Sequence, residues 1–254
     1  MLILHFSRSL LKKAAVCGAV VLLCGLTLTV TPGLRPVDTM GQKPVYAVDR
    51  TDKVISLSFD ASWGAEHTEE LLSALEQYDV KTTFFLVNLW MEEYPDLVRE
   101  IHAQGHEIGL HSATHPHFTE LSENQMTEEL DKNRRLLKEL TGENATLFRP
   151  PYGDYNDTVI RTAEQQGLTA VQWSVDSLDW KGISAEEISR RVMENVTSGS
   201  IILLHNNGDH TVEAVQSILP TLLKEGYKIV PVGEILIKGD SFTDSNGIQH
   251  NAEG

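Results

Sequence analysis

Seven segments with β-strand character alternate with helical segments after residue 53, and this alternation predicts a parallel α/β fold. Each strand prediction rests on a run of alternating or continuous apolar and β-branched residues. The runs cover residues 54–59, 82–87, 107–111, 147–149, 169–173, 200–204 and 228–232. Periodicity leaves open a closed barrel and an open doubly wound sheet. In both, functional side chains are expected just past the carboxyl ends of the strands.

Helix-boundary signals support the alternation. Residues 122–125 and 184–187 each begin with Ser and carry Gln or Glu three positions later, which is the spacing of a capping box. Gly105, Gly167 and Gly226 stand where helices are expected to end, because glycine adopts the left-handed conformation of a helix C-terminus readily. These signals place helices between the predicted strands.

Composition restricts the class of function. The chain has 254 residues, of which 41% are hydrophobic, and this is enough apolar material for a sizeable core. Its formal net charge is −15. An acidic protein is a poor partner for nucleic acid, because phosphate binding requires clustered Lys and Arg. A neutral glycan is compatible with this charge.

The N-terminus has the pattern of an export segment. Arg8, Lys12 and Lys13 precede an uncharged, mostly apolar run over residues 14–30. This pattern predicts a signal peptide or an N-terminal membrane anchor within residues 1–31. The run is close to the shortest length that spans a bilayer, and no small-residue cleavage site follows it closely, which favours the anchor. We therefore expect an extracytoplasmic protein, membrane-anchored or secreted, that contacts the membrane only through this segment.

The rest of the chain divides into three parts. Residues 32–52 contain several prolines and are expected to form a linker, residues 53–238 the folded domain, and residues 239–254 a polar tail that is disordered or loosely attached. Both cysteines, Cys17 and Cys24, lie in the apolar N-terminal run. The domain therefore has no disulfide and no thiolate metal site. We expect a monomer.

Polar residues follow five of the predicted strands. Because the carboxyl ends of parallel strands converge on one edge of the sheet, these side chains are expected to form one site. They are Asp60, His111, Arg149, Asp176, Asp179 and His205.

His111 and His115 are a candidate metal-ligand pair. If the chain turns helically after the strand, residues four apart share one face and both imidazoles suit Zn²⁺. The spacing alone is a weak signal in a chain with ten histidines. The position of the pair directly after a predicted strand strengthens it.

Asp60 and the segment Arg149–Gly153 are candidates for acid–base and oxyanion chemistry. A carboxylate at Asp60 could act as a general base on a metal-bound water, or alternatively cap a turn. The two prolines of the Arg149 segment make a rigid turn that could aim a backbone N–H at an oxyanion. Arg149 itself could pair with a carboxylate. A rigid surface turn is the alternative.

Asp176, Asp179 and Trp180 lie in one predicted loop, and His205 ends the sixth predicted strand. A histidine held by a carboxylate has a raised pKa and suits a general acid. Trp180 could form a sugar-stacking surface, although core packing is the more common role of an isolated tryptophan.

Taken together, these segments resemble the polysaccharide deacetylases with a NodB homology domain, carbohydrate esterase family four. The resemblance extends over residues 53–236. The family pattern His-Ser/Thr-x-x-His matches His111, Ser112 and His115; Arg-x-Pro-Tyr-Gly matches Arg149, Pro151, Tyr152 and Gly153; Asp-x-x-Asp-Trp matches Asp176, Asp179 and Trp180; and Leu-x-His matches Leu203 and His205. The Phe-Asp-x-x-Trp-Gly variant of the first segment is similar to the sporulation-associated PdaB-type members.

The resemblance implies a distorted (β/α) barrel of about seven parallel strands. It also implies a metal-dependent hydrolase that removes N-acetyl groups from an amino-sugar polymer, such as peptidoglycan or a related N-acetylglucosamine glycan in the cell wall or spore cortex. His111 and His115 would hold a divalent metal, most often Zn²⁺, with Co²⁺, Ni²⁺ and Mn²⁺ as alternatives.

The resemblance further implies a role for each remaining residue of the site. Asp60 would take a proton from the attacking water and Arg149 would orient Asp60. His205 would protonate the leaving amine, with Asp179 tuning it. The backbone N–H of Tyr152 would bind the oxyanion, Leu203 would line the acetyl pocket, and Trp180 would contact the sugar.

The first segment departs from the family pattern. The family usually has Thr-Phe-Asp-Asp-Gly, whose second Asp is a metal ligand, and here that position is Ala61. A catalytic zinc normally has three protein ligands. Asp60, Glu66 or His67 could supply the third ligand, and the sequence does not choose among them. The alternative function is a glycan-binding or structural wall protein with little or no catalytic activity on a deacetylase scaffold.

Overall fold

The computed structural model describes residues 42–252. The predicted export segment, residues 1–31, and the first part of the predicted linker, residues 32–41, lie outside the described residues. Within residues 42–252, no helix has the length and apolar character that a membrane crossing requires.

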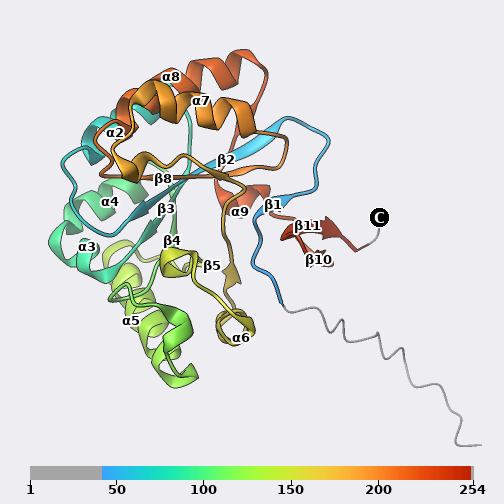
Figure 1. The fold of residues 1–254 in the computed structure, drawn as a ribbon. Coiled ribbons are helices and arrows are strands. Elements are labelled where there is room, and N and C mark those ends of the chain that lie inside the picture. The colour runs from blue at the N-terminus through green and yellow to red at the C-terminus, as the bar shows by residue number, and fades with distance from the viewer. Residues whose placement is uncertain (1–41, 253–254) are drawn as a thin grey trace, which may run out of the picture. The chain divides into compact units, whose positions relative to one another are not determined.

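A parallel β-sheet forms the centre of the domain (Figure 1). Its strands follow the order β6-β5-β4-β3-β2-β8-β7, every neighbouring pair is parallel, and β9 also pairs with β2. Their bounds are β2 (Val54–Ala61), β3 (Thr83–Leu86), β4 (Glu107–Leu110), β5 (Leu147–Phe148), β6 (Thr169–Ala170), β7 (Val175–Asp176), β8 (Ile201–His205) and β9 (Lys228–Ile229). The expectation of about seven parallel strands is confirmed.

The sheet curls into a distorted barrel because its two end strands are almost consecutive in the chain. β6 and β7 lie at opposite ends of the strand order, yet only residues 171–174 separate them. The N–H of Ser174 donates to the carbonyl of Ile201 at 2.9 Å, so the connecting segment is held against β8. The implied distorted barrel is therefore confirmed.

Helices cover the outside of the sheet (Figure 1). α7 packs on α8, α8 on α2, α2 on α4, α4 on α5 and α5 on α6, which gives a continuous outer layer. The bounds are α2 (Thr68–Gln77), α3 (Asn88–Glu93), α4 (Pro95–Ala103), α5 (Glu123–Thr141), α6 (Asp157–Gln165), α7 (Ala185–Asn195), α8 (Thr211–Lys224) and α9 (Val232–Ile235). The short turns η1 (Phe118–Glu120), η2 (Pro151–Gly153) and η3 (Asp179–Lys181) are 3₁₀ helices.

The predicted helix boundaries are largely confirmed. Ser122 and Gln125 form a reciprocal capping box at the start of α5, whereas Ser184 only accepts the Glu187 N–H at the start of α7. The three glycines expected to end helices, Gly105, Gly167 and Gly226, have φ of +81°, +71° and +87°.

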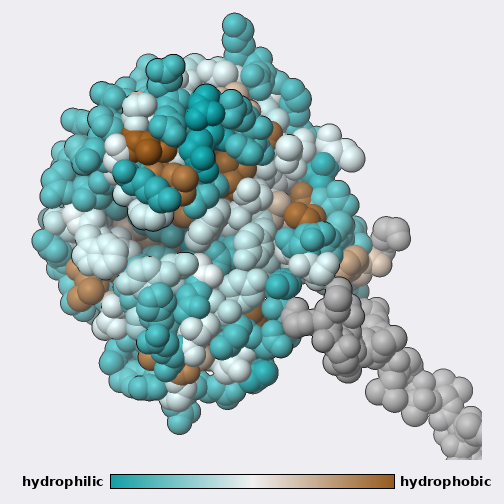
Figure 2. Space-filling view, in the orientation of Figure 1, coloured by the Kyte–Doolittle hydropathy of each residue, from teal (hydrophilic) through white to brown (hydrophobic). Residues whose placement is uncertain are grey.

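Two apolar cores lie on the two faces of the sheet. Successive strand residues point to opposite faces, and Phe84 belongs to the larger core, whereas Phe85 belongs to a smaller cluster with Val171 and Ile201. On the face shown in Figure 2, hydrophobic residues form only small separate patches among hydrophilic ones. This face of the molecule therefore exposes little apolar surface.

The structure corrects the predicted linker and tail. Val45 and Val48 are buried in the smaller cluster, and β1 (Ala47–Val48) pairs with β11 (Ile248–Asn251), which pairs with β10 (Ser241–Thr243). Residues 45–48 and 241–251 thus form structured parts of the domain. The polar composition gave the wrong prediction because Gln249 is buried and accepts the Ile237 N–H, and because the backbone of the tail is hydrogen-bonded both within itself and to residues 46–49.

Candidate active site

A buried ion pair joins the end of β2 to the turn after β5. Oδ1 of Asp60 accepts a hydrogen bond from Nη1 of Arg149 at 2.7 Å. Arg149 is fully buried, and its Nη2 donates to Ser58 Oγ at 2.8 Å and to the carbonyl of Gln172 at 3.1 Å. Its guanidinium carbon lies 4.1 Å from the ring centre of Phe85. Arg149 therefore holds one oxygen of Asp60 in a fixed position from behind the site.

This pairing keeps Asp60 ionised. Burial opposes ionisation of the Asp60 carboxyl, but the charge of Arg149, with smaller contributions from His111 and His205, brings its pKa below the ordinary value. Oδ1 is occupied by Arg149, and Oδ2 lies 3.6 Å from Nε2 of His111. Oδ2 is therefore the oxygen available to accept a proton.

The loop after β4 carries both candidate metal-ligating histidines, but it is not helical. Ser112 and His115 have φ of +79° and +59°, which is left-handed backbone. Ser112 Oγ accepts the His115 N–H at 2.9 Å and closes the turn. The two imidazole centres still lie 4.9 Å apart. The prediction of a helical turn is therefore wrong, but the two rings are adjacent as that turn would have placed them.

Two side chains on one face of α5 hold this loop. Glu129 Oε2 accepts the N–H groups of Ala113 at 3.0 Å and Thr114 at 2.8 Å. One helical turn later, Oδ1 of the fully buried Asn133 accepts the N–H of His111 at 3.0 Å. These bonds satisfy the backbone of an irregular loop and thereby fix where the imidazoles lie.

Both histidines are neutral. Nδ1 of His111 lies 2.7 Å from the carbonyl of Arg149, which can only accept, so Nδ1 carries the proton and Nε2 has the free lone pair. Burial lowers the pKa of His111, and burial together with His111 lowers the pKa of His115 to about 3. Nδ1 of His115 is buried and has no hydrogen-bond partner in the part of the chain that the structure describes. Neutral imidazoles with free lone pairs are the form that binds metal.

A second cluster surrounds His205 at the end of β8. Oδ1 of Asp179 lies 2.7 Å from Nδ1 of His205, and Oδ2 accepts the His205 N–H at 2.7 Å and the Thr211 hydroxyl at 2.6 Å. Gly208 is required here, because a Cβ at this position would overlap the Thr211 hydroxyl. Asp179 is buried, and these bonds fix its orientation and that of the imidazole.

The Asp179 carboxylate makes His205 easier to protonate. Burial opposes charging the imidazole, but the hydrogen bond and charge of Asp179 outweigh burial, and they raise the pKa of His205 above its ordinary value. His205 is thus shifted in the opposite direction from His111 and His115.

The Arg149–Gly153 segment ends in a strained turn that projects Tyr152. Tyr152 has φ +60°, and its ring lies 4.4 Å from that of His115 and stacks on His117 at 4.2 Å. A side chain at Gly153 would press on Trp173, and its φ of +67° also favours glycine. The rigid turn predicted from the two prolines is present, and it faces the site.

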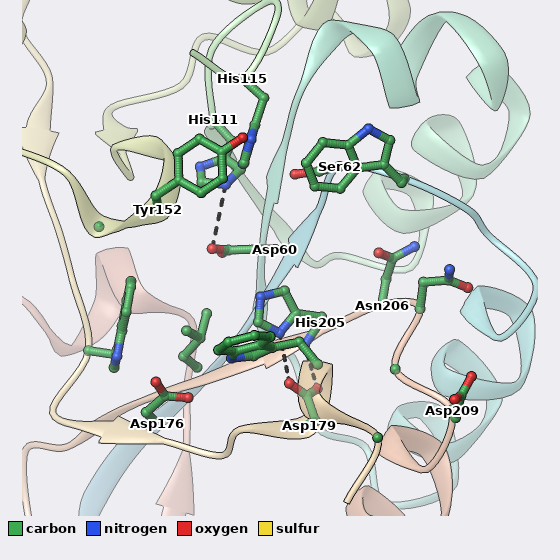
Figure 3. Close-up of a pocket in the computed structure, with 18 residues that line it drawn as sticks. Asp60, Ser62, His111, His115, Tyr152, Asp176, Asp179, His205, Asn206 and Asp209 are labelled. Carbon is green, nitrogen blue, oxygen red and sulfur yellow. Dashed lines mark hydrogen bonds and ion pairs between the residues drawn. The ribbon is translucent and has the colours of Figure 1, made fainter. Parts of the chain in front are cut away.

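These groups meet in one cavity of about 690 Å³. Figure 3 shows Asp60 between the His111–His115 pair and His205, with Tyr152 beside the pair and Asp176 and Asp179 on the His205 side. The predicted residues that line the cavity are Asp60, His111, His115, Tyr152, Asp176, Asp179, Trp180, Leu203 and His205. Arg149 acts from behind Asp60, and Trp180 is 57% exposed at the cavity, so core packing was the wrong expectation for it.

Two of the three residues considered as the third ligand, Glu66 and His67, do not supply one in this arrangement. Ala61 is fully buried in the larger apolar core and does not line the cavity. Glu66 and His67 also lie outside the cavity lining. The position usually held by a metal-binding carboxylate is therefore packed as core.

Sequence reasoning missed several supporting residues. Three of them lie outside the matched family segments: Thr211, Asn133 and Glu129. The only sequence feature that could have identified them is a polar side chain on the buried side of an otherwise amphipathic helix. Asn206 directly follows His205, and Trp63 lies in the departing first segment, so both could have been found by proximity.

The donor set fits a divalent metal in part. His111 and His115 provide two neutral imidazoles, and the buried Nδ1 of His115 has no hydrogen-bond partner among residues 42–252. Among residues 42–252, no group of three or more His, Cys, Asp or Glu has the spacing of a metal site. Asp60 Oδ2, 3.6 Å from His111 Nε2, is the oxygen that can complete a set of three.

Comparison with known proteins agrees with this geometry. The sequence profile of the polysaccharide deacetylase family matches residues 47–171. A peptidoglycan-N-acetylglucosamine deacetylase of Bacillus cereus is 35% identical over 196 residues, which cover 75% of this chain and 92% of the relative. A second B. cereus protein of that name is 37% identical over 69% of this chain, which spans 66% of its length.

A solved structure supports the same assignment and adds a contrast. The CE4 family pseudoenzyme from Bacillus anthracis is 31% identical, with a TM-score of 0.73 over 76% of this chain and 68% of that one. A mutant of the same protein is described as a pseudoenzyme with restored enzymatic activity. Sequence, fold and the arrangement of the strand-end residues therefore agree: the chain belongs to the polysaccharide deacetylase family.

Proposed function

We propose that this protein hydrolyses N-acetyl groups on an amino-sugar polymer, peptidoglycan or a related N-acetylglucosamine glycan. One observation carries the proposal. Asp60 and His205 are register partners on β2 and β8, line one cavity, and have opposite protonation tendencies. The pKa of Asp60 is lowered and the pKa of His205 is raised, so the site holds a base and an acid at the same pH.

The two groups suit the two proton transfers of amide hydrolysis. Asp60 Oδ2 takes a proton from the attacking water while Arg149 holds Oδ1. The water oxygen bonds to the acetamide carbon, and the oxyanion is held by the Tyr152 N–H in its rigid turn. His205 then donates a proton to the amine nitrogen as the C–N bond breaks, and Asp179 stabilises the charged imidazole beforehand. Leu203 lines the space for the acetyl methyl.

We propose a divalent metal, most often Zn²⁺, held by His111 and His115 with Asp60 Oδ2 as the third donor. Such an ion polarises a carbonyl and lowers the pKa of a bound water. Sharing Asp60 between metal and proton reduces its strength as a base. This makes Asp60 the residue on which the level of activity depends.

The cellular setting belongs to the same proposal. The basic and apolar residues 1–31 indicate export, and the relatives' names refer to peptidoglycan. We place the protein outside the cytoplasm, anchored by residues 1–31 or secreted, as a monomer acting on the cell wall or spore cortex. The Phe59-Asp60-x-x-Trp63-Gly64 sequence supports a PdaB-type, sporulation-associated role.

Acetate release from an N-acetylglucosamine oligomer and from peptidoglycan, with Zn²⁺ or Co²⁺ present, tests the proposal. The wild-type protein releases acetate, and Asp60→Asn and His205→Ala each reduce release by about 10²-fold or more. His210→Ala, five residues away and outside the cavity lining, is the matched control and keeps full release. Equal release by all four proteins contradicts the mechanism.

A second function is favoured by one observation, the apolar packing of Ala61. With no carboxylate at this position, the protein could bind glycan on a deacetylase scaffold without turnover, as the name pseudoenzyme indicates for its B. anthracis neighbour. Metal analysis separates the two functions. Wild-type protein that retains one Zn²⁺ per chain after dialysis supports hydrolysis. Little metal in the wild type, more in Ala61→Asp, and glycan binding without acetate release support the scaffold.

A further inference from the structure

Exposed aromatic side chains are concentrated at the candidate active site. Among residues 42–252, six large hydrophobic side chains are exposed. Three of them, Trp63, Tyr152 and Trp180, line the cavity of the candidate active site. Single exposed apolar residues are ordinary, but several in one cavity mark a binding surface. Tyr152 and Trp180 belong to the matched family segments, whereas Trp63 lies in the segment that departs from the pattern.

The backbone that follows Trp63 is anchored in the interior through the carbonyl of Gly64. The carbonyl of Gly64 accepts the indole N–H of Trp90 at 2.7 Å and the amide of Asn206 at 2.9 Å, and both donors are buried. Gly64 has φ +63°, and a Cβ there would overlap Asn207 and Glu66. The backbone beside Trp63 is thus fixed by the interior, while its indole remains 61% exposed. Because the backbone at this position is already ordered, less entropy is lost when the exposed indole binds a ligand.

The contacts of Trp63 and Trp180 place them on different sides of Asp60. The Trp63 ring packs edge-on against His115, with centres 4.8 Å apart. Trp180 follows Asp179, the partner of His205. Because Asp60 lies between the histidine pair and His205 (Figure 3), a ligand that reaches both indoles extends beyond the unit that reacts at Asp60.

The charges near Trp63 restrict the ligand. The cavity is lined by four aspartates, Asp60, Asp176, Asp179 and Asp209, and by no Lys or Arg side chain of the described residues. Lys181 lies over the Trp180 ring at 5.0 Å, while the Glu66 carboxylate lies beside Gly64, next to Trp63. A carboxylate-bearing sugar is therefore disfavoured on Trp63. The flat apolar face of an uncharged sugar suits an exposed indole.

From these observations we infer that Trp63 is a substrate-positioning residue that stacks on an uncharged N-acetylated sugar adjacent to the reacting sugar. The inference rests on the proposed function for the class of ligand.

Calorimetric binding with the full chain tests this inference, using a β-1,4-linked N-acetylglucosamine hexamer, the corresponding dimer, and a hexamer in which alternate sugars carry a lactyl carboxylate. Wild-type protein binds the neutral hexamer more tightly than the dimer. Trp63→Ala loses about tenfold in hexamer affinity and most of the gain from dimer to hexamer. Trp63→Phe restores most of it. Phe242→Ala, an equally exposed aromatic outside the cavity lining, binds like wild type.

The inference is overturned if Trp63→Ala binds the neutral hexamer as tightly as wild type, or if Phe242→Ala loses as much affinity as Trp63→Ala. It is also overturned if Trp63→Ala loses the same affinity for the alternating hexamer as for the neutral one. Thermal unfolding of each variant shows that the fold is intact. Because binding is measured apart from acetate release, Trp63-dependent binding without release contradicts the proposed function alone. Normal release and binding in Trp63→Ala contradict the inference alone.

Discussion

The two histidine clusters of the site differ in how many of their polar atoms are hydrogen-bonded within the protein. In the His205 cluster, Asp179 makes three hydrogen bonds and the pKa of His205 is raised. In the His111–His115 cluster, Nδ1 of His115 has no hydrogen-bond partner from the described residues, and the pKa values of both histidines are lowered. A satisfied, easily protonated imidazole is suited to proton transfer, and an unsatisfied neutral one to a ligand from outside the protein. The difference is consistent with the two proposed roles, proton transfer in the His205 cluster and metal binding in the His111–His115 cluster.

The largest expected effect separates the two halves directly. His115→Ala lowers Zn²⁺ affinity by about 100-fold, because it removes a donor, whereas His205→Ala leaves Zn²⁺ affinity unchanged and abolishes acetate release. Equilibrium dialysis with metal analysis, beside an acetate assay, measures both. Loss of metal from His205→Ala breaks the division into two halves.

The next effect is on the pH dependence of release. The pKa of His205 is raised in the folded protein, so the protonated acid persists above pH 6.5 and release falls as pH rises through this pKa. Asp179→Asn removes the charge that raises it, and the basic limb of the kcat/KM profile moves to lower pH. A basic limb that stays in place assigns the acid to another group. Asp154→Asn, outside the cavity lining, serves as the control.

Stability has the opposite pH dependence in the two halves. The folded pKa of His115 is lowered to about 3, so the unfolded chain binds the extra proton, and stability falls as pH decreases from about 6.5 toward 3. His205, with a raised pKa, contributes stability below pH 6.5 that is lost as pH rises through its folded value. Urea unfolding across pH should show that His115→Gln reduces the acid-side loss. An unchanged acid side contradicts the lowered pKa.

A smaller effect concerns the support of the histidine loop. Asn133→Ala removes the side chain that accepts from the His111 N–H and donates to the Leu86 carbonyl, and it leaves these two groups only their mutual 3.3 Å hydrogen bond. It should cost about 1–3 kcal/mol of unfolding free energy. It should also weaken Zn²⁺ binding. Asn124→Ala, exposed on the same helix, provides the matched control. A stability loss with unchanged metal affinity would show that the loop keeps its shape without this brace.

The smallest effect is expected at Thr211. Thr211→Val removes one of three hydrogen bonds to Asp179, which is worth about 1 kcal/mol and corresponds to a few-fold loss in kcat. Thr221→Val, on the exposed side of the same helix, should change nothing. A loss as large as that of Asp179→Asn would mean that the hydroxyl itself takes part in proton transfer.

Much of the fold and the core of the site could be predicted from sequence, because both depend on local patterns. The strands from β2 to β6 and the strand-end residues Asp60, His111 and Arg149 follow from apolar runs and their ends. β7 could not be found, since two residues with polar neighbours have no periodicity. The strand expected over 228–232 ends at Ile229 because Pro231 leads into α9. Loop braces such as Glu129 depend on tertiary contacts.

Ala61, which replaces a metal-binding carboxylate, shows at a single residue how far sequence-based prediction reaches. The sequence shows that a carboxylate is replaced at Ala61, but only the packing shows that the methyl group belongs to the core between sheet and helices. A change to Asp at this position therefore has to overcome burial before it can bind metal.

The three-stranded sheet of β1, β10 and β11 joins strands from the beginning and the end of the domain, which are also synthesised first and last. Asp49 and His250, 201 residues apart, are joined at 3.0 Å, and β11 is the last strand that the ribosome delivers. β1, whose Val48 lies in the smaller apolar cluster, therefore pairs with β11 only after the strands of the main sheet have been synthesised. A chain that ends before β11 would lack this pairing, so β1 would keep an unpaired edge that is open to proteolysis.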